Sequence, residues 1–216
     1  MPLFMDRTDA GRRLAAALEH YRGRDDVVVL ALPRGGVPVA YEVARALDAP
    51  LDVYVVRKLG TPGRAELAMG AIASGGVMVR NEDIIRHLGI SDAQAEAVAE
   101  RERAELERRE RIYRGGREPL DVRGKTVLLV DDGLATGATM RAAVSALAPR
   151  EPAAVVVAVP TAAPETCDEF RGMVDEVVCV ETPQPFLGVG RWYRHFSQTT
   201  DEEVQDLLAR SSSSQR

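Results

Sequence analysis

Apolar residues along this chain fall into short runs, each followed by a glycine-containing turn and an amphipathic segment. Residues 27–32 (VVVLAL) and 126–130 (TVLLV) are nearly continuous apolar runs, the pattern of strands that are covered on both faces. Helical patterns follow at residues 37–47 and 139–147. This repeated order predicts an α/β fold with a mostly parallel central sheet and helices on both faces.

The remaining elements of the core follow from the same signals. Three further strands and one helix are predicted at residues 52–58, 154–159, 176–180 and 164–171. Near the start of the chain, Thr8 and Asp9 precede apolar positions with helical spacing, and this helix is expected to end near Gly23.

The alternation is interrupted over about residues 61–118. Residues 67–80 are typical of a hairpin that turns at two adjacent glycines. Ser91 and Gln94 then form a capping box, which predicts the start of a long, charged helix with a solvated face. We therefore expect a single domain over residues 1–210 that carries a helical and hairpin insertion.

Composition narrows the class of protein. A chain of 216 residues with 45% hydrophobic content can bury one sizeable core. Its apolar runs are far shorter than the ~18 residues that span a bilayer, and the N-terminus lacks the pattern of a signal peptide. These features predict a cytoplasmic protein without a membrane partner. The net charge of −5 argues against a broad basic surface for nucleic acid, so no nucleic-acid partner is expected.

Two smaller features give expectations of their own. Cys167 and Cys179 lack the paired spacing of a zinc site or a disulfide framework, so we expect both to be reduced. Residues 211–216 (SSSSQR) are polar and of low complexity, which predicts a disordered tail.

The strongest chemical signal lies in residues 127–139 (VLLVDDGLATGAT), where a buried strand ends in Asp131 and Asp132 and leads through a glycine loop into a helix. Ligands of open α/β sheets bind beyond the carboxyl ends of the strands. The loop amides, the helix N-terminus and the hydroxyls of Thr136 and Thr139 suit a phosphate. The carboxylates suit sugar hydroxyls and Mg²⁺. The pattern favours a phosphorylated ribose over an ordinary turn with an incidental acidic pair.

This segment resembles the motif of type I phosphoribosyltransferases that binds 5-phosphoribosyl 1-diphosphate (PRPP). The resemblance covers about residues 8–200 and implies the type I phosphoribosyltransferase fold, with a small hood formed by residues 1–22 and 182–199. It implies that Asp131 and Asp132 are catalytic, hold the ribose hydroxyls and bind Mg²⁺. The residues that it assigns to the 5-phosphate are Gly133, Leu134, Ala135, Thr136, Gly137, Ala138 and Thr139.

A second glycine loop, LPRGGV, follows the first buried strand and resembles the pyrophosphate loop of the family. By this resemblance Gly35 and Gly36 receive the diphosphate, and Arg34 lies beside it as a further catalytic residue. Arg57 and Lys58 end the next predicted strand at the same edge of the sheet, where they would meet the diphosphate. The alternative is that both are ordinary exposed basic residues.

Aromatic residues gather in the second hood segment of a chain that is only 5% aromatic. Aromatic faces suit a planar base, so Phe186, Trp192 and Tyr193 are candidate base-binding residues. A small satellite core is an equal alternative.

Two positions depart from the family members that act on 6-oxopurines. Those enzymes carry an acidic residue where this chain has Ala135, and a lysine where it has Thr161. Adenine enzymes place a glutamate on a mobile loop, for which Glu66 is the candidate by position. The chain looks closest to bacterial phosphoribosyltransferases whose motif does not define their substrate.

The resemblance therefore implies a Mg²⁺-dependent phosphoribosyltransferase, which transfers the phosphoribosyl group of PRPP to a nitrogenous base or amine and releases pyrophosphate. The alternative is a non-catalytic regulatory protein that senses PRPP with the same loops. A relative of PRPP synthetases is disfavoured because no second domain for ATP is evident. The sequence leaves open the acceptor and the choice between a monomer and a homodimer.

Overall fold

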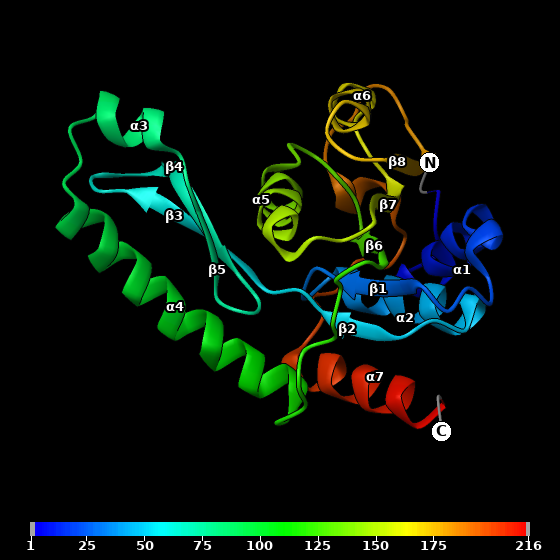
Figure 1. Ribbon diagram of the computed structural model, residues 1–216. Helices are drawn as coiled ribbons and strands as arrows, with labels where there is room; N and C mark the ends of the chain where they lie inside the picture. Colours follow the sequence, from blue (N-terminus) through cyan, green and yellow to red (C-terminus); the bar gives the residue numbers. More distant parts are fainter. Residues whose placement is uncertain (1–2, 215–216) are drawn as a thin grey trace.

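The computed structural model describes residues 3–214, which form an α/β core and an arm that projects from it (Figure 1). The core holds five parallel strands in the order β2-β1-β6-β7-β8. These strands are β1 (Val27–Ala31), β2 (Leu51–Val53), β6 (Thr126–Val130), β7 (Ala154–Thr161) and β8 (Glu176–Glu181). The predicted parallel central sheet is confirmed.

Helices cover both faces of this sheet, as predicted. They are α1 (Arg7–Ala17), α2 (Gly36–Leu47), α5 (Ala138–Leu147), α6 (Pro164–Arg171) and α7 (Asp201–Ser214), with short 3-10 turns at Glu19–Tyr21, Ala148–Arg150 and Val189–Trp192. Alternate residues of β1 enter opposite clusters: Val27 and Val29 pack with α1, α2 and α7, whereas Val28 and Leu30 pack with α5 and α6. This alternation follows from the two-residue period of a strand.

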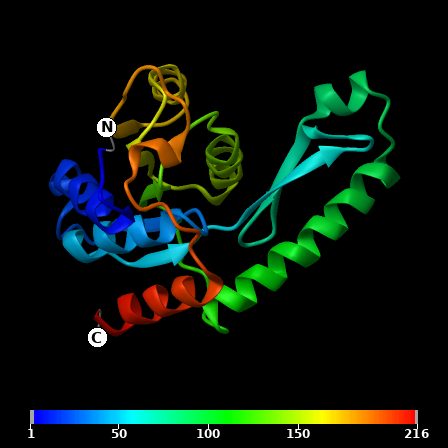
Figure 2. The same cartoon turned by 180° about the vertical axis from the view of Figure 1, so that it is seen from behind.

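The arm combines a three-stranded antiparallel sheet, in the order β3-β4-β5, with two helices. Its elements are β3 (Val56–Thr61), β4 (Arg64–Ala73), β5 (Val77–Arg80), α3 (Glu82–His87) and α4 (Asp92–Arg114). The long helix α4 runs beside this sheet back to the core (Figure 2). The predicted hairpin turn has positive φ at Gly75 and Gly76, and the capping box of Ser91 and Gln94 is present.

The predicted strand over residues 52–58 is wrong, because the chain changes sheets within it. β2 ends at Val53, and the Tyr54 amide still donates to the Ala31 carbonyl of the core. The next amide, of Val55, donates to the Ser74 hydroxyl, and β3 then pairs with β4 in the arm. Residues 56–58 therefore belong to the arm.

The prediction of disorder is wrong for residues 211–214, which continue α7. The hydroxyls of Ser212 and Ser213 donate to the carbonyls of Leu208 and Ala209, and Ser211 is buried. Residues 215 and 216 lie outside the described part of the chain. In residues 3–214, no helix is both long and apolar enough to cross a membrane.

The expectation of reduced cysteines is also wrong, because Cys167 and Cys179 form a disulfide. Their spacing of 12 residues gives no signal for this bond. It arises because α6 lies against the edge strand β8, which brings Cys167 on the helix next to Cys179 on the strand.

A buried ion pair joins the arm to the core. The Arg114 guanidinium at the end of α4 lies 3.0 Å from an Asp52 oxygen, and both side chains are less than one-tenth exposed. Arg114 also donates to the Val53 carbonyl, and Asp52 accepts from the Leu120 amide. These bonds fix the inner end of the arm on strand β2.

Candidate functional site

The two glycine loops predicted from the sequence lie next to each other, because β1 and β6 are parallel neighbours in register. Each loop follows the carboxyl end of its strand. A Cβ atom on Gly36 would lie 2.7 Å from the Val130 carbonyl oxygen, and one on Gly35 would lie 2.1 Å from Asp132 Oδ2. Only glycine permits this approach, so the first loop is packed directly against the acidic pair.

The acidic pair presents two uncommitted oxygens. Asp131 Oδ1 accepts a hydrogen bond from the Asp132 amide at 2.8 Å. Arg7 Nε donates to Asp132 Oδ2 at 2.9 Å, and Arg7 Nη2 lies 2.8 Å from the same oxygen. Among residues 3–214, Asp131 Oδ2 and Asp132 Oδ1 have no hydrogen-bond partner. These two neighbouring carboxylate oxygens can accept hydrogen bonds from two hydroxyl groups.

Burial raises the pKa of both carboxyl groups. At Asp131 the negative charge of Asp132 adds to this rise, whereas at Asp132 the Arg7 guanidinium opposes it. Asp131 therefore carries the less favourable charge of the two.

The second glycine loop forms an anion cradle. A pocket of about 260 Å³ is lined by Asp131, residues 133–140, Lys58 and Val189. Within the described chain, the amides of Ala135, Thr136 and Gly137 donate to no protein acceptor. The N-terminus of α5 follows directly, so free amides and the helix dipole face the same space.

The residues assigned to the phosphate differ in exposure. Ala135, Thr136 and Thr139 are exposed at the pocket, and Gly133, Leu134 and Gly137 are buried beneath it. The Leu134 amide donates to the Thr161 carbonyl at 2.9 Å, which anchors the loop. Thr161 itself is fully buried at this anchor.

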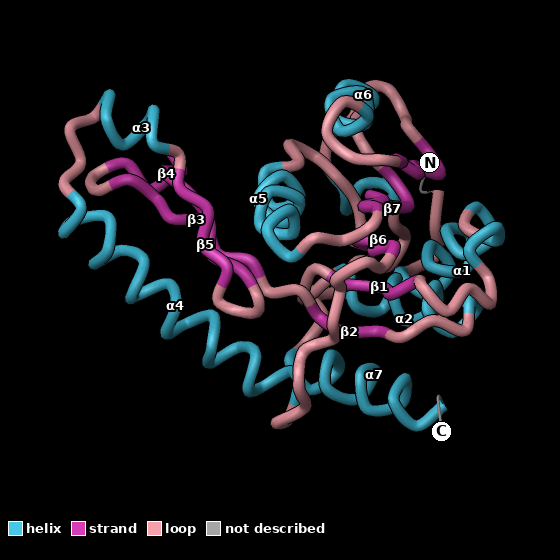
Figure 3. The backbone as a smooth tube through the Cα atoms, viewed as in Figure 1, coloured by secondary structure: helices cyan, strands magenta, loops and turns pink. Residues whose placement is uncertain are grey.

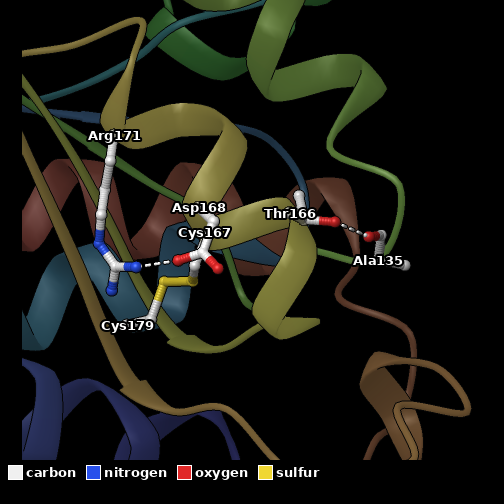
Figure 4. The surroundings of a disulfide bond; sticks show 6 residues. All are labelled: Ala135, Thr166, Cys167, Asp168, Arg171 and Cys179. Carbon is white, nitrogen blue, oxygen red and sulfur yellow. Dashed lines mark hydrogen bonds and ion pairs between the residues drawn. A yellow bond between two sulfur atoms is a disulfide. The ribbon is translucent and has the colours of Figure 1, made fainter.

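Helix α6 supports the cradle from behind, a role that the sequence did not predict. The Thr166 hydroxyl donates to the Ala135 carbonyl at 2.7 Å, and the disulfide at the next residue, Cys167, ties the helix to β8 (Figure 4). A Cβ atom on Gly137 would lie 2.7 Å from the Phe170 ring. The loop is thus held against one face of α6.

The predicted cations divide between two places. Lys58 is exposed, lines the cradle pocket and has no ion-pair partner in the described chain. The Arg57 guanidinium instead pairs with Glu102 on α4 at 2.6 Å. Arg57 is thus held within the arm, to which β3 belongs, and its assignment to the diphosphate stays a prediction.

Arg34 lies in the first loop, after a cis peptide bond between Pro33 and Arg34. Its guanidinium is about one-third exposed and lies 3.6 Å from Asp201 at the start of α7. The amides of Arg34 and Gly35 have no acceptor within residues 3–214. This loop accordingly offers free amides to an anion, and the Arg34 guanidinium is paired with Asp201.

The hood joins the two predicted segments, with little regular structure between β8 and α7 (Figure 3). Phe4 pairs with Tyr193, whose ring centroid lies 5.4 Å from that of Phe4. Tyr193 is buried, and its hydroxyl donates to the Asp132 carbonyl at 2.6 Å. The ring belongs to the hood's own small core, the alternative that the sequence left open, and contact between Tyr193 and a base stays a prediction.

The other two aromatic candidates are half-buried. The ring centroids of Phe186 and Trp192 lie 6.3 Å apart. These rings remain available as candidates for contact with a planar group. The side chain of Glu66, the candidate glutamate over the site, lies outside the described residues.

An acidic pair and a phosphate-type cradle thus lie at the ends of adjacent parallel strands, the arrangement that the sequence resemblance implies. Residues 5–190 match the family described as "Phosphoribosyl transferase domain", and the chain belongs to this family. The match covers the five-stranded sheet, the arm and part of the hood, and it ends before α7.

Among proteins of similar sequence, "Putative phosphoribosyl transferase Rv0571c" of Mycobacterium tuberculosis is 49% identical over 211 residues, which is 98% of this chain. The chain spans about half of that protein's length, at 47%. Among solved structures, TT1426 from Thermus thermophilus is 44% identical, with a TM-score of 0.86 over 97% of this chain and 99% of that one. The arm is thus part of a fold that is shared over nearly the full length.

Proposed function

We propose that this protein is a Mg²⁺-dependent phosphoribosyltransferase that binds PRPP and transfers its phosphoribosyl group to a nitrogenous base or amine, with release of pyrophosphate. One observation carries the proposal: two uncommitted carboxylate oxygens lie between two loops whose amides lack protein acceptors. This arrangement matches a ligand with hydroxyl groups in the middle and a phosphate at each end.

The donor is assigned to the site in three parts. The 5-phosphate accepts hydrogen bonds from the cradle amides of residues 135–137, with Lys58 beside it. The ribose hydroxyls donate to Asp131 and Asp132. The diphosphate lies against Gly35 and Gly36, where Arg34 supplies positive charge. Such prior orientation of the reactant lowers the entropic part of the reaction barrier.

The donor set fits Mg²⁺. Mg²⁺ prefers oxygen ligands and is usually bound by one or two carboxylates together with substrate phosphates. Asp131 and Asp132 would hold it through their uncommitted oxygens. No larger group of metal-binding side chains occurs among the described residues, which agrees with a metal that arrives with its substrate. When bound, the ion would neutralise negative charge on the departing pyrophosphate.

In the proposed reaction, the bond between C1 of the ribose and the diphosphate oxygen breaks, and a bond from C1 to the acceptor nitrogen forms. The acceptor nitrogen supplies the electron pair of the new bond, its proton passes to the pyrophosphate, and the electrons of the broken bond leave with the pyrophosphate. The loop amides and Arg34 stabilise the charge that develops on the leaving group. The carboxylates hold the ribose so that C1 faces the acceptor.

The acceptor is expected not to be a 6-oxopurine. Ala135 cannot exchange a proton with a purine ring, and the buried Thr161 supplies no cation to a 6-oxo group. Phe186 and Trp192 are the remaining candidates for stacking on a planar acceptor. Adenine, another aromatic nitrogen base or an amine fits these features better.

The test is a coupled assay of pyrophosphate release over a panel of bases and amines at saturating Mg²⁺ and PRPP. The variant with both Asp131→Asn and Asp132→Asn serves as the blank. We expect turnover with at least one acceptor and negligible turnover with hypoxanthine or guanine. Robust turnover of guanine would contradict the argument from Ala135 and Thr161. If PRPP binds but no acceptor in the panel gives pyrophosphate release, the result would instead support a PRPP-sensing regulator.

A further inference from the structure

Arg7, at the start of α1, connects the hood to the acidic pair. Its side chain is only 12% exposed; Nε donates a hydrogen bond to Asp132 Oδ2, and Nη2 lies 2.8 Å from the same oxygen in an ion pair. A second hydrogen bond runs from Nη1 to the Ser197 carbonyl at 2.7 Å. The guanidinium also lies 4.0 Å from the centre of the Phe196 ring. These four contacts hold the guanidinium in one place, unlike a solvent-exposed ion pair.

The Arg7 guanidinium lies next to both parts of the candidate site. A Cβ atom on Gly35 would lie 3.3 Å from Arg7 Nη2, so the guanidinium borders the first glycine loop as well as Asp132. The neighbouring Tyr193 hydroxyl holds the backbone of Asp132. Asp132 is therefore held by the hood at two points, its carbonyl and one carboxylate oxygen.

The geometry of the fork determines which oxygen stays free. Arg7 Nε and Nη2 both contact Oδ2, which leaves Oδ1 available to a ligand. A carboxylate that is fixed by a charged hydrogen bond and an ion pair on one oxygen loses its freedom to rotate, so a hydroxyl that binds Oδ1 meets an acceptor already in place. Without Arg7, Asp132 would remain beside Asp131 with no cation to hold it.

We propose that Arg7 is a positioning residue, which orients Asp132 toward a ribose hydroxyl and links that orientation to the hood through Ser197 and Phe196. This inference rests on the proposed function, because it assumes that Asp132 binds ribose. It differs from a general structural role in one measurable respect. Loss of Arg7 should weaken recognition of the sugar and leave the phosphate cradle intact.

The experiment compares Kd values for ribose 5-phosphate and inorganic phosphate, measured by calorimetry on the full chain. Arg7→Gln is the test variant. Arg13→Gln is the matched control, because Arg13 lies on the same helix, forms an exposed ion pair with Asp9 and stacks near Phe4. We expect wild type and Arg13→Gln to bind ribose 5-phosphate more tightly than phosphate. In Arg7→Gln this preference should shrink by about tenfold, the effect of a lost charged hydrogen bond.

A second variant, Arg7→Lys, keeps the positive charge but lacks the planar guanidinium. It is the test variant if Arg7→Gln does not fold. It should fold and show an intermediate preference. An unchanged preference in either folded Arg7 variant would overturn the inference, while the wild type would still support the proposed function. A wild type that binds ribose 5-phosphate no better than phosphate would overturn the ribose assignment itself.

Discussion

The core and the arm are built by different means. Every residue of β1 and β6 is buried, whereas β3 and β5 consist largely of half-buried residues. The core places two glycine loops against each other with no room for a Cβ atom at Gly35 or Gly36. The arm is attached by apolar packing of its sheet against α5 and by polar contacts such as the pair of Arg114 and Asp52, and it adds Lys58 to the cradle. The core thus fixes the geometry, and the arm adds charge.

The largest effect is expected where the arm joins the core. Asp52→Ala would leave the buried Arg114 guanidinium with Glu110 as its remaining carboxylate and the Leu120 amide without its acceptor, and should lower the free energy of unfolding by about 3–5 kcal/mol. Arg108→Ala is the control on the same helix, because it removes an exposed pair with Glu105 and should cost less than about 1 kcal/mol. Urea denaturation measures both. Equal losses would show that the buried pair does not anchor the arm.

The next prediction concerns the edge of the core that carries α6. Replacing both Cys167 and Cys179 by serine should lower the free energy of unfolding by about 3 kcal/mol, from the entropy of a closed loop of this length. Phosphate binding should weaken as well, because α6 holds the Ala135 carbonyl. A reducing agent should reproduce both effects in the wild type and change nothing in the double variant. Two free thiols in unreduced, denatured wild type would contradict the disulfide.

Sequence patterns predicted the core well, because strands buried on both faces leave continuous apolar runs and the acidic pair with its glycine loop is a local signal. They failed where contacts are distant in sequence. Arg7 lies 125 residues from Asp132, and nothing near Arg7 marks it as a partner. Arg57 and Lys58 are adjacent, yet the change of sheet after β2 sends one to Glu102 and the other to the cradle.

This division of neighbours gives a third prediction. Lys58→Ala should weaken phosphate and PRPP binding about tenfold, a loss of about 1.4 kcal/mol, and leave stability unchanged because the side chain is exposed. Arg57→Ala should lower stability and leave phosphate and PRPP binding unchanged, since its partner Glu102 lies within the arm. Calorimetry and urea denaturation on both variants test the contrast. A binding loss in Arg57→Ala that matches that of Lys58→Ala would contradict this contrast and support the assignment of both cations to the diphosphate.

The smallest effect is expected at the acidic pair. Burial and the charge of Asp132 raise the folded-state pKa of Asp131, so the ionised carboxylate costs the folded protein stability at neutral pH. This cost shrinks as the pH falls below the folded-state pKa and is gone below the unfolded-state pKa. Asp131→Asn should therefore raise the free energy of unfolding at pH 7 by about 1 kcal/mol. Asp132→Asn should not, because it leaves Arg7 without its charged partner. A less stable Asp131→Asn would contradict this account of the site.

The most direct test of the central claim is a calorimetric titration of the wild type with PRPP in the presence of Mg²⁺. The account predicts saturable binding that is tighter than that of ribose 5-phosphate, because only PRPP also fills the loop at residues 33–36. It further predicts that combining Asp131→Asn with Asp132→Asn weakens PRPP binding far more than phosphate binding. No heat of binding, together with no thermal stabilisation by Mg²⁺ and PRPP, would contradict the assignment of the site.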